Sequence, residues 1–509
     1  MNLSYLLYIA LKNLTHDQKF CLILLCCLTC LPLPLLVQAE VEKPNVIVIL
    51  TDDQGYADVG FHHLPAGEDV LTPNLDRLAA SGIVFRNGYV AFSTCGPSRS
   101  SLLTGRSSSR FGIEDNGTWP NGDTGPPTDE IILPRLLKPL GYQSGAFGKW
   151  HLGESEGMLP LDRGFDYYWG DIPKHKDYFM RHLPQPPCWN PPKPQEECYL
   201  TDAITDEAVA FIKRNQEQTF FAYVAYNAPH SPFRTTESLV KRIVEHQPKF
   251  QSAYKRMQQQ KKFPRYDFGR FKGTDLDMEI LRLVYCSMLL SVDDGVGKIL
   301  ATLDELEIRE NTLIFYLSDN GAALARPNDL GGVNLPLRSG KGSVYDGGVR
   351  VPYVMSWPGT LTPARNEDML VSSMDIFSTT LELAGGVLPQ DRKIDGVNLI
   401  PYLTDEKEGR PHKYLFFRRQ DRNAWALRHG RYKWVWNPGK KAHLRSENPA
   451  LMPESNSEGG LYDIQHDWTE WNDLSEEQPE VKERLKRLYK KFTKDFPPPM
   501  SSSSPGQDK

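Results

Sequence analysis

The sequence has few cysteines, no excess of positive charge and, after residue 40, no long apolar run. Only four of its eight cysteines lie beyond residue 30, which excludes a fold built on a dense disulfide framework. Lys and Arg number 59 against 64 Asp and Glu, and the net charge of −5 gives no global basic field for nucleic acid or an anionic membrane. We therefore expect no nucleic-acid partner, and any anion must be bound by a local site.

The N-terminal segment has the pattern of an export signal. Basic residues precede the apolar run 20–36, and Ala39 supplies the small residue that a signal peptidase needs. A membrane anchor is the alternative, but two prolines interrupt the run, and a lipoprotein box fits poorly because Cys30 follows a threonine. The sequence predicts that residues 1–39 are a signal peptide. The protein is then periplasmic or secreted, or lysosomal in a eukaryote, with no stable membrane span after cleavage.

Three of the later cysteines have structural explanations. Cys188 and Cys198 flank a Pro-rich loop, and in an oxidising compartment they can form a disulfide, the alternative being two unpaired thiols. Cys286 lies among apolar residues, which favours a small buried hydrophobe. Cys95 is the remaining one.

The chain from about residue 45 to 386 alternates strand-length apolar runs with helix-like stretches. Val46–Leu50, Phe220–Val224 and Leu313–Leu317 have no polar face, as expected for strands covered by helices on both sides. This alternation predicts an α/β fold with a large, mainly parallel sheet flanked by helices. The helix candidates are residues 74–81, 201–215 and 278–306, the last being one helix or two interrupted near Gly295 and Gly297.

Other segments have different patterns. Residues 174–194 and 247–272 are expected to be surface insertions. Short strand candidates after residue 395, followed by a helical segment at 479–496, predict a smaller C-terminal antiparallel sheet with a helix. The predicted organisation is a main catalytic domain at 40–394, a C-terminal subdomain at 395–497 and a disordered tail at 498–509.

Polar residues directly follow four of the strand candidates. The run that ends at Leu50 leads to Asp52 and Asp53, and the run that ends at Leu317 leads to Asp319 and Asn320. The other two runs lead to residues 149–151, Lys-Trp-His, and to residues 227–230, Asn-Ala-Pro-His. Ligands of open α/β sheets bind at the carboxyl ends of the strands, so we expect these side chains to share one crevice.

The acidic and amide groups in this set suit a hard cation. Asp52, Asp53, Asp319 and Asn320 offer only oxygen ligands, which fit Ca²⁺ or Mg²⁺ and are poorly suited to Zn²⁺. An Asp-Asp pair after a strand is more often a turn or a helix cap. The second pair, Asp319-Asn320, in the same context favours the metal site.

Cys95 lies at the predicted start of a helix. Pro97 stands in the first turn and Gly105 ends the segment, so residue 95 is near free backbone N–H groups that favour an anion. Arg99 lies one turn on, on the same face. These features suit a bound sulfate or phosphate, but a buried structural cysteine explains Cys95 equally well.

At these residues the chain resembles the sulfatase family of the alkaline-phosphatase-like superfamily, and most closely the arylsulfatase A and N-acetylgalactosamine-6-sulfatase type. Cys95-Gly96-Pro97-Ser98-Arg99, continued by Ser101-Leu102-Leu103-Thr104-Gly105-Arg106, resembles the maturation signature of the family. Gly148-Lys149-Trp150-His151-Leu152-Gly153 resembles its second signature. The resemblance extends from about Pro44 to about Leu474 and includes Leu461-Tyr462-Asp463 with Asp467 and Glu470.

The resemblance implies a sulfuric ester hydrolase that acts on a sulfated carbohydrate or an aryl sulfate. A separate formylglycine-generating enzyme would convert Cys95 to formylglycine (3-oxoalanine), whose hydrate supplies the nucleophile. One calcium ion would be held by Asp52, Asp53, Asp319 and Asn320, with the modified Cys95 as a further ligand. The remaining roles are implied in the same way: Arg99 stabilises the ionised hydrate, Lys149 and Lys341 bind sulfate oxygens, His151 is a base, and His230 is a general acid.

Two of these roles depend on position in the family pattern. Without it, Lys341 in a Ser-Gly-Lys-Gly run would be a solvated loop residue, and Pro229-His230 a simple turn. The family-like run Gly347-Gly348-Val349-Arg350-Val351-Pro352 after Lys341 supports the first role.

Two other functions fit the same residues. A phosphonate monoester or phosphodiester hydrolase can use the same nucleophile, since a helix N-terminus does not distinguish sulfate from phosphate. An unmatured glycan-binding protein would keep the fold with an unmodified thiol at Cys95. Candidates for substrate contacts on insertion-like loops are Lys174, His175, Asp177, Arg181 and Arg234.

Overall fold

The structure is a computed structural model, and contacts divide the chain into two compact units, Met1–Glu42 and Lys43–Lys509. The residues that it describes all lie in the second unit: 43–116, 125–171, 178–180, 198–259, 277–324, 331–419, 423–437 and 459–498. The predicted signal peptide and the tail after residue 498 lie outside them. The domain boundaries at 394 and 395 stay a prediction.

The main sheet has eight strands in the order β11-β2-β10-β9-β1-β8-β4-β5. The run β9-β1-β8-β4-β5 is parallel, and β10 pairs antiparallel with both β9 and β2. The expected large, mainly parallel sheet is therefore confirmed. The strands are β1 (Asn45–Thr51), β2 (Ile83–Phe85), β4 (Gln143–Lys149), β5 (Tyr167–Asp171), β8 (Phe220–Ala225), β9 (Thr312–Ser318), β10 (Tyr353–Ser356) and β11 (Arg365–Glu367).

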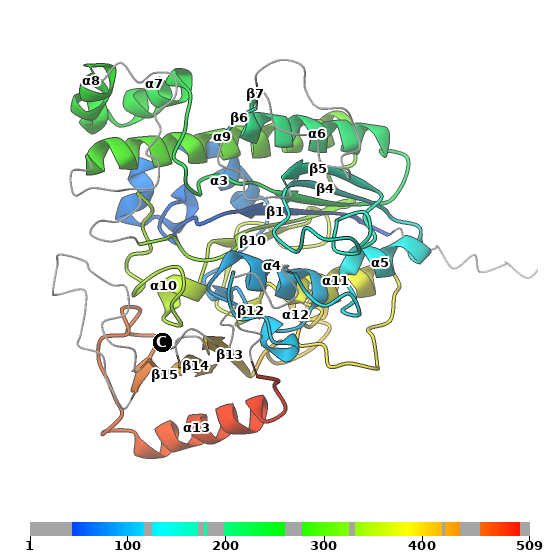
Figure 1. Cartoon of the computed structure of the whole chain (residues 1–509), viewed down its shortest axis with the longest axis vertical. Coiled ribbons are helices and arrows are strands. Elements are labelled where there is room, and N and C mark those ends of the chain that lie inside the picture. Colours follow the sequence, from blue (N-terminus) through cyan, green and yellow to red (C-terminus); the bar gives the residue numbers. More distant parts are fainter. Residues whose placement is uncertain are drawn as a thin grey trace, which may run out of the picture. The chain divides into compact units, whose positions relative to one another are not determined.

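The central strands are buried on both faces. Every residue of β1, β8 and β9 is buried, which explains why these segments are apolar throughout and do not alternate. Figure 1 shows helices on both sides of the sheet. One side carries α3 (Pro73–Ala80), α6 (Leu200–Arg214) and α9 (Met278–Glu305), and the other carries α4 (Cys95–Thr104), α5 (Leu133–Leu137) and α11 (Asp375–Leu383).

Helix α9 is one continuous helix and not two. Its glycines mark close approaches of neighbouring side chains: a Cβ on Gly295 would lie 2.4 Å from Thr205 Oγ1, and one on Gly297 2.6 Å from Asn74 Cγ. Glycine is therefore needed here for packing and does not interrupt the helix. Among the residues that the structure describes, no helix has the length and hydropathy that a membrane crossing requires.

The segment 247–272 is more structured than a surface insertion. After α7 (Glu237–His246), the helix α8 (Gln251–Gln259) buries Ala253, Tyr254 and Met257 and contacts α9. Its apolar positions lie on one helical face, a pattern that the many polar residues around them obscure. Residues 260–272 lie outside the described residues.

The C-terminal part forms the expected antiparallel sheet, called the small sheet below, in the order β13-β14-β15-β16. Its strands are β13 (Tyr414–Arg419), β14 (Ala424–His429), β15 (Tyr432–Trp436) and β16 (Gly460–Asp463), and α13 (Pro479–Thr493) packs on β14 and β15. The remaining elements are β3 (Gly88–Tyr89) paired with β12 (Val371–Ser372), β6 (Phe179–Met180) paired with β7 (Cys198–Tyr199), α10 (Asp346–Val349) and α12 (Ile400–Leu403).

Two of the cysteines outside the active site lie among the described residues, and both are free thiols. Cys286 is fully buried in α9, as expected. Cys198 in β7 is a free thiol, which agrees with the alternative of two unpaired thiols. Cys188 itself lies outside the described residues. The disulfide was inferred only from the flanking of a Pro-rich loop, a pattern that sets no distance between the two sulfur atoms.

Candidate active site

The carboxyl ends of four parallel strands meet at one edge of the main sheet. Leu50 in β1 pairs in register with Leu317 in β9 and with Ala225 in β8, and Ala225 also pairs with Gly148 in β4. The residues that follow these strands therefore emerge side by side. They are Asp52 and Asp53 after β1, Asp319 and Asn320 after β9, Lys149 and His151 at the end of β4, and His230 after β8. Ion pairs and short distances among the side chains confirm that they lie close together.

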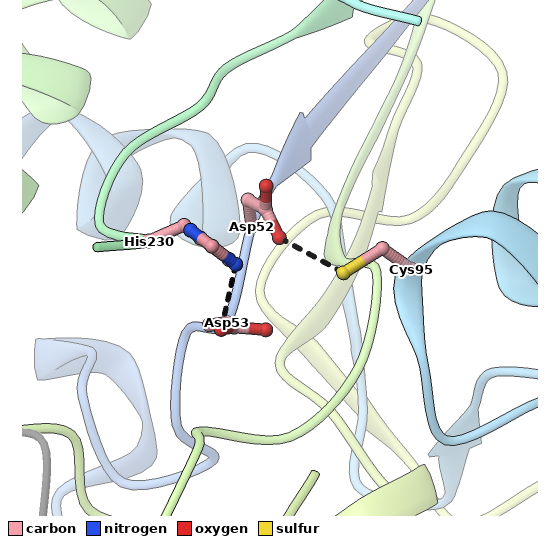
Figure 2. Close-up of side chains that lie close together, drawn as sticks. All are labelled: Asp52, Asp53, Cys95 and His230. Carbon is pink, nitrogen blue, oxygen red and sulfur yellow. Dashed lines mark hydrogen bonds and ion pairs between the residues drawn. The ribbon is translucent and has the colours of Figure 1, made fainter. Parts of the chain in front are cut away.

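Helix α4 brings Cys95 to the same place. Thr94 is extended and Cys95 is the first helical residue, and Gly105 in the left-handed conformation ends the helix, as the sequence predicted. Figure 2 shows the Cys95 side chain directed at Asp52, with a distance of 3.4 Å between Sγ and Asp52 Oδ1. The ammonium of Lys341 lies 3.1 Å from the same sulfur atom. Cys95 is 1% exposed. Its contacts with Asp52 and Lys341 make it part of a buried polar cluster.

Three carboxylates of this cluster face three fixed cations. Arg99 in α4 pairs with Asp319 at 2.8 Å, Lys341 pairs with Asp53 at 2.6 Å, and Lys149 pairs with Asp52. Arg99 and Asp319 are fully buried, while Lys149 and Lys341 keep 13% and 17% of their side chains exposed. The two lysines therefore lie at the open side of the cluster, where an anion can reach them.

The donor set fits a hard cation. Oxygen or sulfur atoms of Asp52, Asp53 and Cys95 and a ring nitrogen of His230 all lie within 4.8 Å of one another. Asn320 donates from Nδ2 to Asp53 Oδ1 at 2.7 Å, while its Oδ1 is buried without a hydrogen-bond partner among the described residues. A buried amide oxygen without a donor is a ready ligand for a metal ion. Asp53 itself has a positive φ of 65°, a strained conformation typical of functional sites.

The two histidines differ in their surroundings. His230 Nδ1 lies 2.6 Å from the carbonyl oxygen of Ser231, which can only accept, so Nδ1 carries a proton. This orientation directs Nε2 toward Asp53 at 3.6 Å, as Figure 2 shows. His151 Nδ1 is buried and has no hydrogen-bond partner in the part of the chain that the structure describes. Burial and the charges of Lys149 and Arg99 lower the pKa of His151 well below its usual range, which keeps it neutral.

Burial raises the pKa of two acidic groups of the site but not that of Asp52. It raises the pKa of Asp319 to about 6, together with the charge of Asp52. It raises the pKa of the Cys95 thiol to about 12, together with Asp319 and Asp52, so an unmodified Cys95 is protonated at neutral pH. Burial alone would raise the pKa of Asp52 too, but the basic side chains around it hold that pKa well below its usual range: Lys149, His230, Arg99 and Lys341.

The carboxylates keep the lysines charged. Burial, the largest single influence, lowers the pKa of each ammonium, but the surrounding acidic groups together outweigh it, led by Asp52 at Lys149 and by Asp53 at Lys341, so both pKa values are raised. Both ammonium groups are therefore positively charged at neutral pH.

One site residue has a role that the sequence did not show. The side-chain oxygen of Asn116 accepts the N–H of Gly96 at 2.9 Å and so holds the first turn of α4. In the sequence Asn116 begins an Asn-Gly-Thr run, a pattern that does not predict this contact. Of the expected substrate-contact residues, Arg234 is partly buried and its carbonyl accepts the Tyr199 hydroxyl at 2.8 Å. Lys174, His175, Asp177 and Arg181 lie outside the described residues.

Comparison with known proteins agrees with this geometry. Residues 44–387 match the family model described as Sulfatase, and residues 340–495 match the model described as N-sulphoglucosamine sulphohydrolase, C-terminal. The chain is 36% identical over 425 residues to the N-acetylgalactosamine-6-sulfatase of Canis lupus familiaris, covering 78% of this chain and 72% of that protein. It is 33% identical over 429 residues to the arylsulfatase A of Bos taurus, covering 78% and 75%.

A solved structure is similar over most of its length. Ps i-CgsB in complex with k-i-k-neocarrahexaose superimposes with a TM-score of 0.71 and 30% identity, over 90% of this chain and 94% of that chain. The fold and the polar cluster define a hydrolase of the alkaline-phosphatase-like type. More particularly, the chain belongs to the sulfatase family and hydrolyses sulfate esters.

Proposed function

We propose that the chain removes sulfate from a sulfated carbohydrate, with a formylglycine formed from Cys95 as nucleophile and a calcium ion bound beside it. The observation that carries the proposal is the position of Cys95, at the start of α4 and between the carboxylate of Asp52 and the ammonium of Lys341. The substrate class is supported by the relatives, one named for N-acetylgalactosamine-6-sulfate and one in complex with an oligosaccharide.

Each group of the site has a defined task in this proposal. Hydrated formylglycine supplies two hydroxyls, one to bond to sulfur and one whose proton must be removed to expel sulfate. Calcium, held by Asp52, Asp53, Asp319 and Asn320 with residue 95, would supply a Lewis acid at the sulfate oxygens. Lys149 and Lys341 bind these oxygens, and Arg99, fixed by Asp319, orients residue 95 and offsets its negative charge. Neutral His151 takes the proton from the second hydroxyl.

Maturation must come before folding. All residues of α4 are buried, including Cys95, Pro97 and Arg99, so the folded chain hides the segment that a maturation enzyme has to read. This supports modification of the unfolded chain by a separate formylglycine-generating enzyme. The predicted signal peptide at residues 1–39 would direct export of the unfolded chain, and modification at that stage would satisfy this order. We therefore propose an exported protein.

Mass spectrometry of residue 95 tests the proposal. The protein is purified from its native source, and the tryptic peptide that ends at Arg99 is analysed for an aldehyde at position 95. We expect the aldehyde, and an intact thiol throughout would refute the mechanism and favour the unmatured glycan-binding protein. Rates on matched sulfate and phosphate monoesters complete the test, since a large phosphate preference would favour the phosphonate or phosphodiester hydrolase.

His230→Ala is expected to affect esters according to their leaving groups. A sugar alcohol must be protonated as it leaves, whereas 4-nitrophenolate leaves without a proton. Nε2 can donate only when the ring carries a second proton, and loss of this group should lower kcat/KM for a sugar sulfate by roughly 10²- to 10⁴-fold and change that for 4-nitrophenyl sulfate far less. Exposed His246 at the end of α7 provides the control, since H246A should change neither rate. An equal loss on both esters would show that His230 is not the general acid.

A further inference from the structure

A buried charge cluster joins the small sheet to the loop that carries Lys341. Lys433 in β15 pairs with Asp346 in α10 at 2.6 Å and with Glu470, which follows β16, at 2.8 Å. The side chains of all three are fully buried. Two carboxylates and one ammonium taken out of water are expensive unless their geometry is well satisfied. The cluster must therefore be held in one arrangement, which makes it suited to fix neighbouring backbone.

Glu470 holds the Lys341 loop on both sides of the lysine. Its Oε2 accepts the backbone N–H of Asp346 at 2.6 Å, after Lys341 in the sequence. Its backbone carbonyl accepts Nη1 of Arg338 at 2.8 Å, before Lys341. The carbonyl of Arg338 in turn accepts the N–H of Gly347 at 2.8 Å. This hydrogen bond joins the two ends of the loop that carries Lys341. Glu470 itself has a positive φ of 51°, a backbone strain that the surrounding contacts must maintain.

The opposite side of the loop is hydrogen-bonded to the segment that follows β9 and to the segment that precedes α4. Lys341 N–H donates to the carbonyl of Ala322 at 3.0 Å, and Gly342 N–H donates to the carbonyl of Ser93 at 2.7 Å, next to the start of α4. Asn334 bridges the carbonyls of Ala322 and Ser339. The position of the Lys341 ammonium, 3.1 Å from Cys95 Sγ, therefore depends on two supports, the strand ends on one side and Glu470 on the other.

We propose that Glu470, paired with Lys433, is a positioning residue for the reaction: it fixes the Lys341 loop so that the ammonium meets the sulfate group. The proposal rests on the proposed role of Lys341 in binding sulfate. Glu470 touches neither substrate nor residue 95, and it acts through the loop. The small sheet thus contributes to catalysis by the main domain without supplying a group to the crevice.

The test is a double-mutant cycle between Glu470 and Lys341. Glu470→Gln preserves the shape of the side chain. Lys433 still forms an ion pair with Asp346, so no buried charge is left unpaired. The amide has only one oxygen acceptor for two donors, Lys433 and the Asp346 N–H, so one contact is lost. We expect E470Q to lower kcat/KM for a sulfate ester, and to weaken competitive inhibition by inorganic sulfate, by about 10- to 100-fold. In a K341A background the same change should have almost no effect.

Glu114→Gln is the matched control. Glu114 is a buried carboxylate that also joins the main domain to the small sheet, but it does so through Arg418 in β13. E114Q should lower stability while leaving inhibition by sulfate unchanged. If E470Q does not yield folded protein, E470D, which keeps the charge and shortens the reach, replaces it in the cycle.

The outcomes separate this proposal from the proposed function. If K341A retains wild-type kcat/KM and sulfate inhibition, the proposed role of Lys341 is wrong. If K341A is impaired but E470Q behaves as wild type, or reduces activity equally with and without Lys341, Glu470 has no positioning role. Loss of the E470Q effect in the K341A background alone supports the proposal.

Discussion

Replacing Cys95 with alanine is expected to abolish sulfate ester hydrolysis, by on the order of 10⁶-fold in kcat, as for other hydrolases that lose their covalent nucleophile. The change removes the functional group of residue 95, whose unmodified sulfur atom contacts the side chains of Asp52 and Lys341, so the start of α4 should be preserved. Binding of inorganic sulfate should persist, because Lys149 and Lys341 keep their carboxylate partners and their charge. The variant should therefore bind sulfate without turning substrate over.

Cys286→Ala is the control that separates loss of the nucleophile from loss of a buried thiol. Cys286 in α9 is as buried as Cys95, and burial raises its thiol pKa to about 12 as well, but it lies outside the polar cluster. C286A should lose about 1 kcal/mol of stability and keep kcat. Steady-state rates, thermal unfolding and isothermal titration with sulfate distinguish the two variants. A C95A protein within tenfold of the wild-type kcat would refute the nucleophile.

The strand ends of the site were predictable because parallel strands impose a common edge. Once residues 46–50 and 313–317 were recognised as buried strands, Asp52 and Asp319 had to emerge together, and the register of β1 with β9 shows this. The helix start at Cys95 was equally local, since Pro97 and Gly105 mark its two ends. Neither argument could identify the nucleophile, because local physics allowed a buried thiol at residue 95. The family resemblance was needed for that.

Other parts of the site had no local signal. Gly295 and Gly297 suggested a break in α9. In the structure the absence of a side chain at these glycines lets Thr205 and Asn74, which lie far away in the sequence, pack closely against the helix. The contact of Asn116 with Gly96 depends on a loop that returns to α4. The buried charge cluster of Lys433, Asp346 and Glu470 depends on how the small sheet packs on α10. Such tertiary pairings do not follow from periodicity or from the residues that flank a segment.

The second large effect is expected from the metal site, where removal of calcium should reduce activity to background. Chelation of the purified enzyme with EGTA should also lower its melting temperature, and added Ca²⁺ should restore both, because a ligand that binds only the folded chain stabilises it. Asp53→Asn should remove this response. Asp53 is the carboxylate shared by Lys341, Asn320 and His230, so loss of its charge disturbs every part of the crevice. We expect a fall in kcat/KM of roughly 10²- to 10³-fold.

Asp293→Asn serves as the control for loss of a buried carboxylate. Asp293 accepts the N–H groups of Asn74 and Leu75 at the start of α3 and lies outside the crevice, so D293N should lower the melting temperature and still respond to calcium. Scanning calorimetry of the three proteins with and without Ca²⁺ gives the comparison. A wild-type protein whose melting temperature ignores both EGTA and calcium would contradict the proposed cofactor. A D53N protein with the full calcium shift would instead place the ion elsewhere, since Asp53 supplies one of the negative charges of the oxygen set around Asn320.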